Sequence, residues 1–405
     1  MSATRHRDLR TGRSVWSARR LPHVPRERLT RDARADVIVV GSGVSGAMIA
    51  DALSDAGRRV LIVDRRPPVS GSTPASTALL QYEIDVPLTH LARSVGQVRA
   101  ERIWRRSHLA LSALRNRIAH LGLDADVEEC RSLYLDGTVL DPEALAAEAD
   151  ARRGVGFEVT SLSPRQVKAQ YGITGRHGLV GYGNLSADPR RLTAAFLRAS
   201  LARGARLLSP VDVAAVESDR DGVRAHTVQG PTLRADTLVF ATGYELPKGV
   251  PSTGHSIVST YAIATRPQPG RLWKARGFIW EASDPYLYLR IGPDGRVICG
   301  GEDEDFSQST HRDALLPAKV AAIERKLHRL LPDLDARADY TWCGSFGASD
   351  TGTPSIGAVP RMPNCYAVLG YGGNGITYSA MAAQMLRNEL TGRGDPDSDL
   401  FAFRR

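Results

Sequence analysis

The order of apolar and polar positions over residues 36–64 predicts a strand, a helix and a second strand in close succession. Residues 36–40 and 60–63 are short apolar runs with strand composition. Between them, apolar residues recur at helical spacing over 48–53, and Ala56-Gly57 marks a helix end. We therefore expect a βαβ unit near the start of the chain.

Three glycines join the first strand of this unit to its helix as G-x-G-x-x-G. Gly41 permits the tight turn, Gly43 lets the backbone approach a pyrophosphate, and Gly46 lets the helix pack closely on the strand. The helix N-terminus adds unpaired N–H groups and a positive dipole end. Asp64, 18 residues beyond Gly46, stands where an acceptor for ribose hydroxyls belongs. The unit predicts a dinucleotide site, and a glycine turn without a ligand is the other interpretation.

The rest of the chain mixes helical and strand patterns. Residues 90–121 have helical periodicity, and Asp188-Pro189 begins a helix that ends near Gly204. Strands are expected at 205–208, 211–217, 223–228, 236–241, in several segments of 257–301, and at 366–369. Two more helices are expected at 312–331 and 376–390. Because nucleotide-type segments stand on both sides of a β-rich insert, the domains are expected to interleave.

These elements predict an α/β fold of composite α+β type, in which a Rossmann-type cofactor domain interleaves with a mixed β-sheet substrate domain. The length of 405 residues is enough for two domains with separate cores. The expected parts are a basic N-terminal arm (1–35), a discontinuous cofactor domain (36–124, 184–256 and 346–395), a substrate or cap domain (125–183 and 257–345) and a tail (396–405).

The net charge of +9 is concentrated in the arm, where residues 1–35 hold ten Arg, no Lys and three acidic residues. The nearly neutral remainder argues against a nucleic-acid-binding groove along the body. No apolar run is long enough for a transmembrane segment. We expect the arm to pack irregularly on the body through Val15, Trp16 and Leu21. An organellar transit peptide or a membrane-surface tether is the alternative.

The four cysteines, Cys130, Cys299, Cys343 and Cys365, lie far apart in the sequence without CxxC or His/Cys ligand spacing. This spacing favours reduced thiols and a cytoplasmic location. It argues against a disulfide scaffold or a zinc site, and no metal is expected.

A second group of glycines, in GYGGNGIT over residues 370–377, lies between a strand and a helix. Thr242-Gly243 ends another apolar strand. Glycine at this density indicates backbone packed against something flat or anionic. If a flavin lies there, the N-terminus of the last helix would stabilise the negative charge of the reduced ring. A helix entry with structural glycines is the alternative.

With these segments the chain resembles the D-amino-acid oxidase superfamily, which includes glycine oxidase and sarcosine oxidase-like flavoenzymes. The matching segments are VVGSGVSG, the acid at Asp64, GSTPASTALLQYEID (71–85), FATGYE (240–245), YLYLR with GRVICGG (286–301), and GYGGNGIT (370–377). They run in order along nearly the whole chain from Asp36. The resemblance implies bound FAD, a Rossmann-type FAD domain, and a β-sheet substrate domain that covers the flavin ring.

The resemblance also implies which residues hold FAD. Those expected around the ADP half are Gly41, Gly43, Val44, Ser45, Gly46, Asp64 and Arg65, with Val211 at the adenine. Those expected along the pyrophosphate and ribityl chain are Ser72, Thr73 and Ser76. Those expected at the strand end and around the ring are Thr242, Gly243, Gly372, Gly373, Gly375, Ile376 and Thr377.

The chain departs from the family pattern at Ser345 and Phe346, and Cys343 bears on how a flavin would be attached. Amino-acid-oxidising members commonly place a carboxylate-clamping Arg where this chain has Ser345 and Phe346, so a bidentate clamp is absent from its usual place. The substrate is then an amine without an α-carboxylate, or the clamp comes from elsewhere. Cys343 stands near the position where sarcosine oxidase-like members attach flavin covalently; a small buried cysteine on a strand is the alternative.

Three residues are candidates for the chemistry, each with a structural alternative. Glu83 could attract a protonated amine or accept its proton, or be a salt-bridged carboxylate. Tyr261 could orient the substrate, or its ring could only pack in the buried interior. Arg290 could replace the missing clamp, or pair with nearby acids such as Glu302.

These observations predict an FAD-dependent oxidoreductase that oxidises a C–N bond of a small amine or amino acid by hydride transfer to flavin N5. Oxygen or another electron acceptor would reoxidise the flavin. One alternative is a hydroxy-acid or glycerol-phosphate-type dehydrogenase. Another is a flavin domain in an RNA- or membrane-associated modification protein. An NAD-linked dehydrogenase is a further competitor, although it leaves the later glycine segments without a role.

Overall fold

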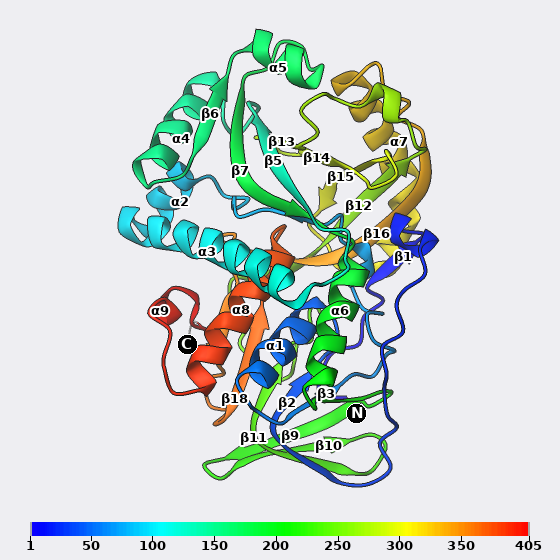
Figure 1. Cartoon of the computed structure of the whole chain (residues 1–405), viewed down its shortest axis with the longest axis vertical. Coiled ribbons are helices and arrows are strands. Elements are labelled where there is room, and N and C mark those ends of the chain that lie inside the picture. The colour runs from blue at the N-terminus through cyan, green and yellow to red at the C-terminus, as the bar shows by residue number, and fades with distance from the viewer. Residues whose placement is uncertain (1, 404–405) are drawn as a thin grey trace.

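A parallel sheet forms the lower half of the molecule in the computed structural model, which describes residues 2–403 (Figure 1). Its strands, in spatial order, are β17 (Ser355–Ala358), β18 (Cys365–Leu369), β11 (Thr232–Phe240), β2 (Ala33–Val40), β3 (Val60–Val63) and β8 (Arg206–Leu208). The strands from β18 to β8 run parallel, while β9 (Val213–Asp219) and β10 (Gly222–Thr227) extend β11 as antiparallel strands. Nearly all residues of β3 and the second half of β2 are buried, as a sheet covered on both faces requires.

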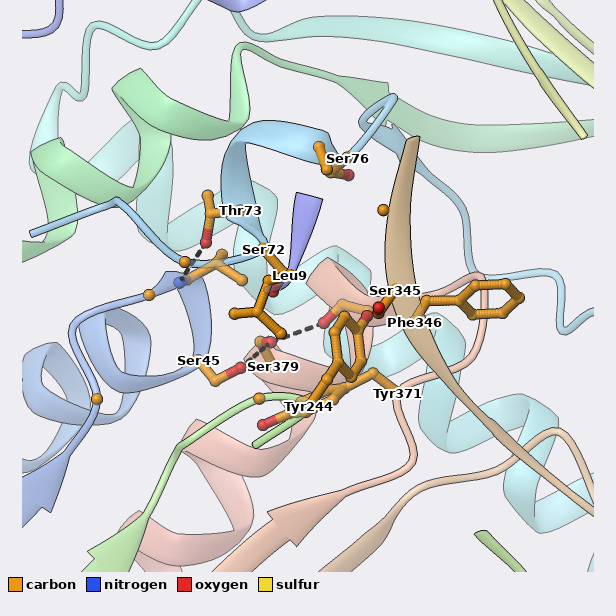
Figure 2. Close-up of a pocket in the computed structure, with 18 of the residues that line it drawn as sticks. Leu9, Ser45, Ser72, Thr73, Ser76, Tyr244, Ser345, Phe346, Tyr371 and Ser379 are labelled. Carbon is orange, nitrogen blue, oxygen red and sulfur yellow. Dashed lines mark hydrogen bonds between the residues drawn. The ribbon is translucent and has the colours of Figure 1, made fainter. Parts of the chain in front are cut away.

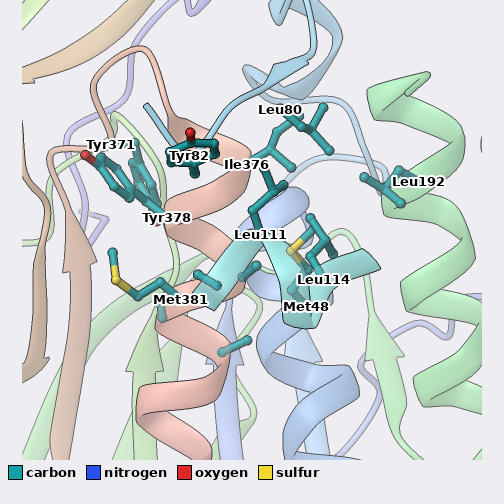
Figure 3. Close-up of a cluster of buried hydrophobic side chains, with 14 of the residues drawn as sticks. Met48, Leu80, Tyr82, Leu111, Leu114, Leu192, Tyr371, Ile376, Tyr378 and Met381 are labelled. Atoms are coloured by element: carbon teal, nitrogen blue, oxygen red, sulfur yellow. The ribbon is translucent and has the colours of Figure 1, made fainter. Parts of the chain in front are cut away.

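Helices cover one face of this sheet. They are α1 (Val44–Asp55), α3 (Gln97–Leu121), α6 (Pro189–Ala202) and α8 (Gly375–Leu390), with α2 (Leu88–Val95) beside α3. Met48 of α1, Leu111 of α3 and Met381 of α8 meet in one buried apolar cluster, which Figure 3 shows between the helices. Burial of such side chains stabilises the packing by about 1.5–3 kcal/mol each. This packing holds the N-termini of α1 and α8 beside each other.

A second sheet forms the upper half. Its order is β1 (Arg10–Gly12), β16 (Ala338–Ser349), β12 (His255–Thr265), β15 (Val297–Glu304), β14 (Leu287–Ile291), β13 (Phe278–Glu281), β5 (Glu128–Leu135), β7 (Gly178–Ser186) and β4 (Leu79–Leu80), with β6 (Val159–Leu162) on β7. The outer helices are α4 (Pro142–Gly154), α5 (Pro164–Tyr171) and α7 (Ser309–Leu330), and α9 (Ser398–Phe401) lies near the C-terminus. α7 packs on β16, β12 and β15 over a separate apolar core.

The expected α/β architecture with a βαβ unit is confirmed, and the differences are local. The helical stretch at 90–121 is broken at Gly96, whose φ of +88° does not continue a helix, so α2 and α3 are separate. The arm contributes β1 to the upper sheet, and residues 79–80, assigned to the cofactor domain, pair with β7 of that sheet. The division into cofactor and substrate domains stays a prediction.

Residues 2–403 contain neither a helix that could span a membrane nor a cluster of metal-binding side chains. No helix in that range is both long and apolar enough to cross a membrane. No group of three or more His, Cys, Asp or Glu side chains is placed there to hold a metal ion.

Candidate active site

One cavity lies between the two sheets, and its walls come from both sheets, from the N-termini of α1 and α8, and from the N-terminal arm. Figure 2 shows part of this wall, including Ser45, Thr73 and Tyr371. The cofactor residues expected from the sequence that line it are Gly41, Gly43, Val44, Ser45, Asp64, Arg65, Ser72, Thr73, Ser76, Val211, Thr242, Gly243, Gly372, Gly373, Gly375 and Ile376. Segments far apart in the chain therefore meet around one space.

Gly46 and Thr377, which were also expected at the cofactor, do not line the cavity. A Cβ on Gly46 would lie 1.9 Å from the carbonyl oxygen of Gly41, so the glycine allows α1 to pack on the turn. The hydroxyl of Thr377 donates to the carbonyl of Gln81 at 2.7 Å and ties α8 to the 71–85 segment. Both residues support the cavity wall from behind.

The N-terminus of α1 opens on the cavity without a side-chain cap, because its N-cap residue is Gly43. The N–H of Val44 donates to the hydroxyl of Thr73 at 3.1 Å. The first-turn N–H groups of a helix have no partner within the helix and carry a positive partial charge. This end of α1 therefore provides a site for an anionic group such as a pyrophosphate.

Asp64 follows β3 at one end of the cavity. One carboxylate oxygen accepts from the N–H and the hydroxyl of Ser42, each at 2.7 Å, and the other accepts from the N–H of Arg66 at 2.8 Å. Burial raises the pKa of Asp64, while these hydrogen bonds oppose that shift. The carboxylate braces the glycine turn and still faces the cavity.

Arg65 and Arg66 line the same end and share one acid. Arg65 donates to Glu245 at 3.0 Å, and Arg66 forms two hydrogen bonds to it, at 2.6 and 2.7 Å. Burial disfavours a charge on Glu245, yet Arg66 holds the pKa of that carboxyl below its usual range. Both guanidinium groups are therefore committed to a protein carboxylate.

The N-terminal arm lies along the cavity, and Ala3, Thr4 and Leu9 form part of its wall. The N–H of Ala3 donates to Val213 at 2.7 Å, and the carbonyl of Leu9 accepts from Ser345 at 3.0 Å. Sequence reasoning missed these three residues, because nothing local marks an irregular segment as part of a distant wall.

Farther along the arm, Trp16 is almost fully buried and donates from Nε1 to the carbonyl of Ser76 at 2.7 Å. Arg10 donates to the carbonyl of Gly71 at 3.2 Å. The arm therefore packs on the body, partly as a strand, and covers the turn that was expected to hold the cofactor.

Another part of the cavity lining is an acidic and aromatic surface that we call the inner wall. Its residues are Asp85, Thr260, Trp280, Tyr286, Tyr288 and Asp303. Tyr288 lies over Gly300, where a Cβ would be 2.4 Å from the phenol oxygen, so only glycine leaves room for the ring. Burial, with a smaller contribution from the Asp85 charge, raises the pKa of Asp303 to about 6.

The inner-wall residues were missed as site residues, although several stand in the segments quoted from the sequence. Asp85 ends GSTPASTALLQYEID, and Tyr286 and Tyr288 stand in YLYLR. The alternation of residues along YLYLR could have indicated that Tyr286 and Tyr288 share one face, because neighbouring residues of a strand face opposite sides of a sheet.

A family model for DAO, FAD dependent oxidoreductase, matches residues 36–388. The chain belongs to the DAO family of FAD-dependent oxidoreductases. The probable oxidoreductase OrdL of Haemophilus influenzae is 20% identical over 380 residues, covering 90% of this chain and 84% of that protein. Glycine oxidase of Geobacillus kaustophilus is 24% identical over 397 residues, covering 91% of this chain and 96% of that protein. The crystal structure of glycine oxidase from Geobacillus kaustophilus has the same fold, with a TM-score of 0.75 at 20% identity over 92% and 99% of the two chains.

The cavity of this DAO-family oxidoreductase fits FAD. The glycine turn after β2 and the uncapped N-terminus of α1 line it, where they would hold the pyrophosphate. Gly243 and Gly372, with φ of +60° and +52°, bring bare backbone to the wall. The N-terminus of α8 stands beside the inner wall, where it would face the flavin ring.

None of the three candidates for chemistry is among the residues that line the cavity of this oxidoreductase. Glu83 is buried behind it, where it accepts from Ser132 and, at 3.1 Å, from Asn184. Tyr261 lies in the apolar core beneath α7, because its neighbour Thr260 takes the cavity side of β12.

Arg290 lies on the same strand as Tyr288 but nearer the arm. It donates to the carbonyls of Ala78 and Ala187 at 2.7 and 3.0 Å, and its guanidinium lies 5.6 Å from the centre of the Trp16 ring. It does not pair with Glu302, whose partners are Lys319 and Lys326. Arg290 therefore ties β14 to the segments that carry Ala78 and Ala187.

Cys343 is fully buried in the core beneath α7 and does not line the cavity. Its sulfur lies 3.5 Å from a carboxylate oxygen of Asp313. Burial raises the pKa of this thiol to about 11, so it is protonated at neutral pH. This placement favours the packing role for Cys343 over flavin attachment.

Proposed function

We propose that this protein oxidises a C–N bond of a small amine or amino acid. The observation that carries the proposal is the inner wall, which presents two carboxylates, Asp85 and Asp303, to the cavity. An ionised carboxylate favours a bound ammonium group and opposes a second carboxylate. Relatives named glycine oxidase and D-amino acid dehydrogenase support a substrate of this class.

The residues of the inner wall have roles in binding and proton transfer. Asp303 can hold the ammonium group and accept its proton, because the pKa of its carboxyl is raised to about 6. The rings of Tyr286 and Tyr288, with centres 5.6 Å apart, enclose the substrate and exclude water. FAD, when bound, supplies the acceptor for the hydride from the α-carbon of the neutral amine. The two-electron oxidation gives an imine, and water converts it to a carbonyl compound and an amine or ammonia.

The proposal is tested by mixing the purified holoenzyme with amines, amino acids and hydroxy acids without oxygen and following the flavin absorbance. We expect bleaching with members of the amine and amino-acid sets and none with hydroxy acids. Bleaching by hydroxy acids alone would instead support the dehydrogenase alternative. Readmission of oxygen then distinguishes an oxidase, which recovers its absorbance quickly, from an enzyme that needs another acceptor.

A further inference from the structure

We propose that the substrate is an organic cation, an alkyl or arylalkyl amine that carries no carboxylate next to the oxidised C–N bond. This inference rests on the proposed oxidation of a C–N bond and narrows it to one substrate class. It is carried by the balance of charge around the cavity and by the aromatic residues of the inner wall.

The two carboxylates of the inner wall lack a cationic partner. Neither Asp85 nor Asp303 forms a salt bridge to any Lys, Arg or His within residues 2–403. Asp85 accepts the N–H of Gly373 at 2.9 Å, and one oxygen of Asp303 is buried without a hydrogen-bond partner. Asp303 is half-buried and Asp85 is exposed, and both line the cavity. Carboxylates that a bound ligand removes from water are normally paired with a positive charge. A cationic ligand would supply that charge.

The nearby cations are committed to other acids. Lys319 binds Glu304 and lies 3.6 Å from Glu302, on the face of the sheet away from the cavity, with its Nζ 5.7 Å from the centre of the Tyr261 ring. Arg152 is fully buried in an ion pair with Glu148 at 2.8 Å. Neither cation lines the cavity.

The cations that do line the cavity are Arg65 and Arg66, among the residues that the structure describes. They line the cavity with the arm and Val211, and both bind Glu245. At the usual clamp position the wall has Ser345 and Phe346. Ser345 accepts from the buried Arg312 at 3.0 Å, and Arg312 also pairs with Asp313. A substrate α-carboxylate at the inner wall would therefore meet two like charges and no cation among the nearby lining residues.

The aromatic residues provide a second, independent argument. Tyr286 and Tyr288 stand together, and Trp280 is stacked on Tyr134 with ring centres 3.8 Å apart. Aromatic faces attract cations and pack against apolar substituents. Gly300 leaves the space that the Tyr288 ring occupies. An amine with an alkyl or aryl chain satisfies both the carboxylates and these rings.

The first test is a spectral titration of the FAD-loaded protein with two phenyl-bearing probes of opposite charge, benzyltrimethylammonium and benzoate. Ligands beside a flavin perturb its visible absorbance, so binding is read without turnover. We expect the cation to bind at least about tenfold more tightly than benzoate, as like-charge repulsion predicts. Tighter binding of benzoate, or equal binding of the two probes, would overturn the inference.

The second test uses Asp303→Asn and Asp85→Asn, with Asp305→Asn as the matched control. Asp305 is an exposed acid two residues from Asp303 that does not line the cavity. We expect each inner-wall variant to weaken benzyltrimethylammonium binding by about tenfold or more and the control to leave it unchanged. The FAD spectrum and the melting temperature verify that the variants are folded. Unchanged affinity in both folded inner-wall variants would contradict the inference.

The third test compares benzylamine with both enantiomers of phenylglycine, which differ from it by the α-carboxylate. We expect anaerobic flavin reduction to be at least about a hundredfold faster with benzylamine at equal concentration. Faster reduction by phenylglycine would overturn this inference and leave C–N oxidation standing. Reduction by neither, nor by any other amine or amino acid, together with bleaching by hydroxy acids, would overturn the proposed function itself.

Discussion

The backbone N–H of Gly373 donates to the carboxylate of Asp85 across 2.9 Å, which holds an acidic side chain at the N-terminus of α8. The helix dipole favours a negative charge at this position. A Cβ on Gly373 would lie 2.7 Å from both carboxylate oxygens, so the absence of a side chain there sets the position of Asp85.

Gly373→Ala should therefore move Asp85 without unfolding the protein, because the obstructed group is the end of a flexible side chain. We expect the affinity for benzyltrimethylammonium to fall about tenfold, as for loss of a charged hydrogen bond. The measurement is the spectral titration, with Gly270→Ala as the control, since a methyl group at Gly270 meets nothing within 4 Å. Unchanged affinity in Gly373→Ala would show that Asp85 does not contribute to the inner wall.

Cation binding should depend on pH through Asp303. Burial raises the pKa of this carboxyl to about 6, the hydroxyl of Thr260 and the Lys319 charge lower it, and Asp85 raises it further. As the pH falls from 7.5 to 5, Asp303 gains a proton and loses its attraction for the ammonium group. We expect the affinity for benzyltrimethylammonium to fall over this range and the dependence to flatten in Asp303→Asn. If the affinity of Asp303→Asn fell at low pH as steeply as that of the unchanged protein, the titrating group would not be Asp303.

The carboxyl of Asp303 should lower the stability of the fold at the same high pH at which it strengthens cation binding. Its folded-state pKa lies above the ordinary value of 3.8, so the folded protein holds this proton more tightly than the unfolded chain does. Asp303 therefore destabilises the fold above about pH 6, and this cost disappears as the pH falls below about 4. Asp303→Asn should stabilise the apoprotein by roughly 1 kcal/mol at pH 8 and by little at pH 4. Thermal unfolding at the two pH values measures this, and a gain of equal size at both would refute the assignment.

Removal of residues 1–8 should weaken FAD retention. Ala3 and Thr4 belong to the cavity wall, and the N–H of Arg7 donates to Glu245 at 2.8 Å. We expect faster release of FAD and a dissociation constant at least about tenfold higher, followed by the fluorescence of freed flavin. The control is Arg28→Ser with Arg31→Ser, which removes arm charge at two exposed positions. If the control lost FAD and the truncated protein retained it fully, the arm would act on FAD through its charge and not through its packing.

Arg290 should be needed for stability and not for substrate binding. Arg290→Met leaves the carbonyls of Ala78 and Ala187 without a donor, which costs about 1–3 kcal/mol for each buried group. We expect a lower melting temperature and an unchanged KM for amines. A raised KM with an unchanged melting temperature would instead place Arg290 in contact with the substrate.

The local pattern over residues 36–64 was sufficient to predict β2, α1 and β3 and their glycine turn. This is because the signals that form a βαβ unit lie within one short segment. A dinucleotide site was predictable for the same reason, since glycines and a helix N-terminus act through the backbone, and the later glycine segments with the family resemblance narrowed the cofactor to FAD. The missing arginine at Ser345 and Phe346 was also visible in the sequence.

The choice between Glu83 and Asp85 depended on the tertiary structure. Both acids stand in one short loop, yet Glu83 accepts from Ser132 and Asn184 in the interior while Asp85 faces the cavity. Likewise, Thr260 rather than Tyr261 reaches the cavity, because the packing of α7 decides which face of β12 is covered.

What the sequence by itself determined, then, is the cofactor, whose binding elements are local and depend on backbone geometry. The tertiary structure decided the substrate end, because its carboxylates and rings come from segments between residues 85 and 303 that meet only when the two sheets pack. It also decided the role of the arm, since hydrogen bonds to residues more than two hundred positions away hold it over the cavity.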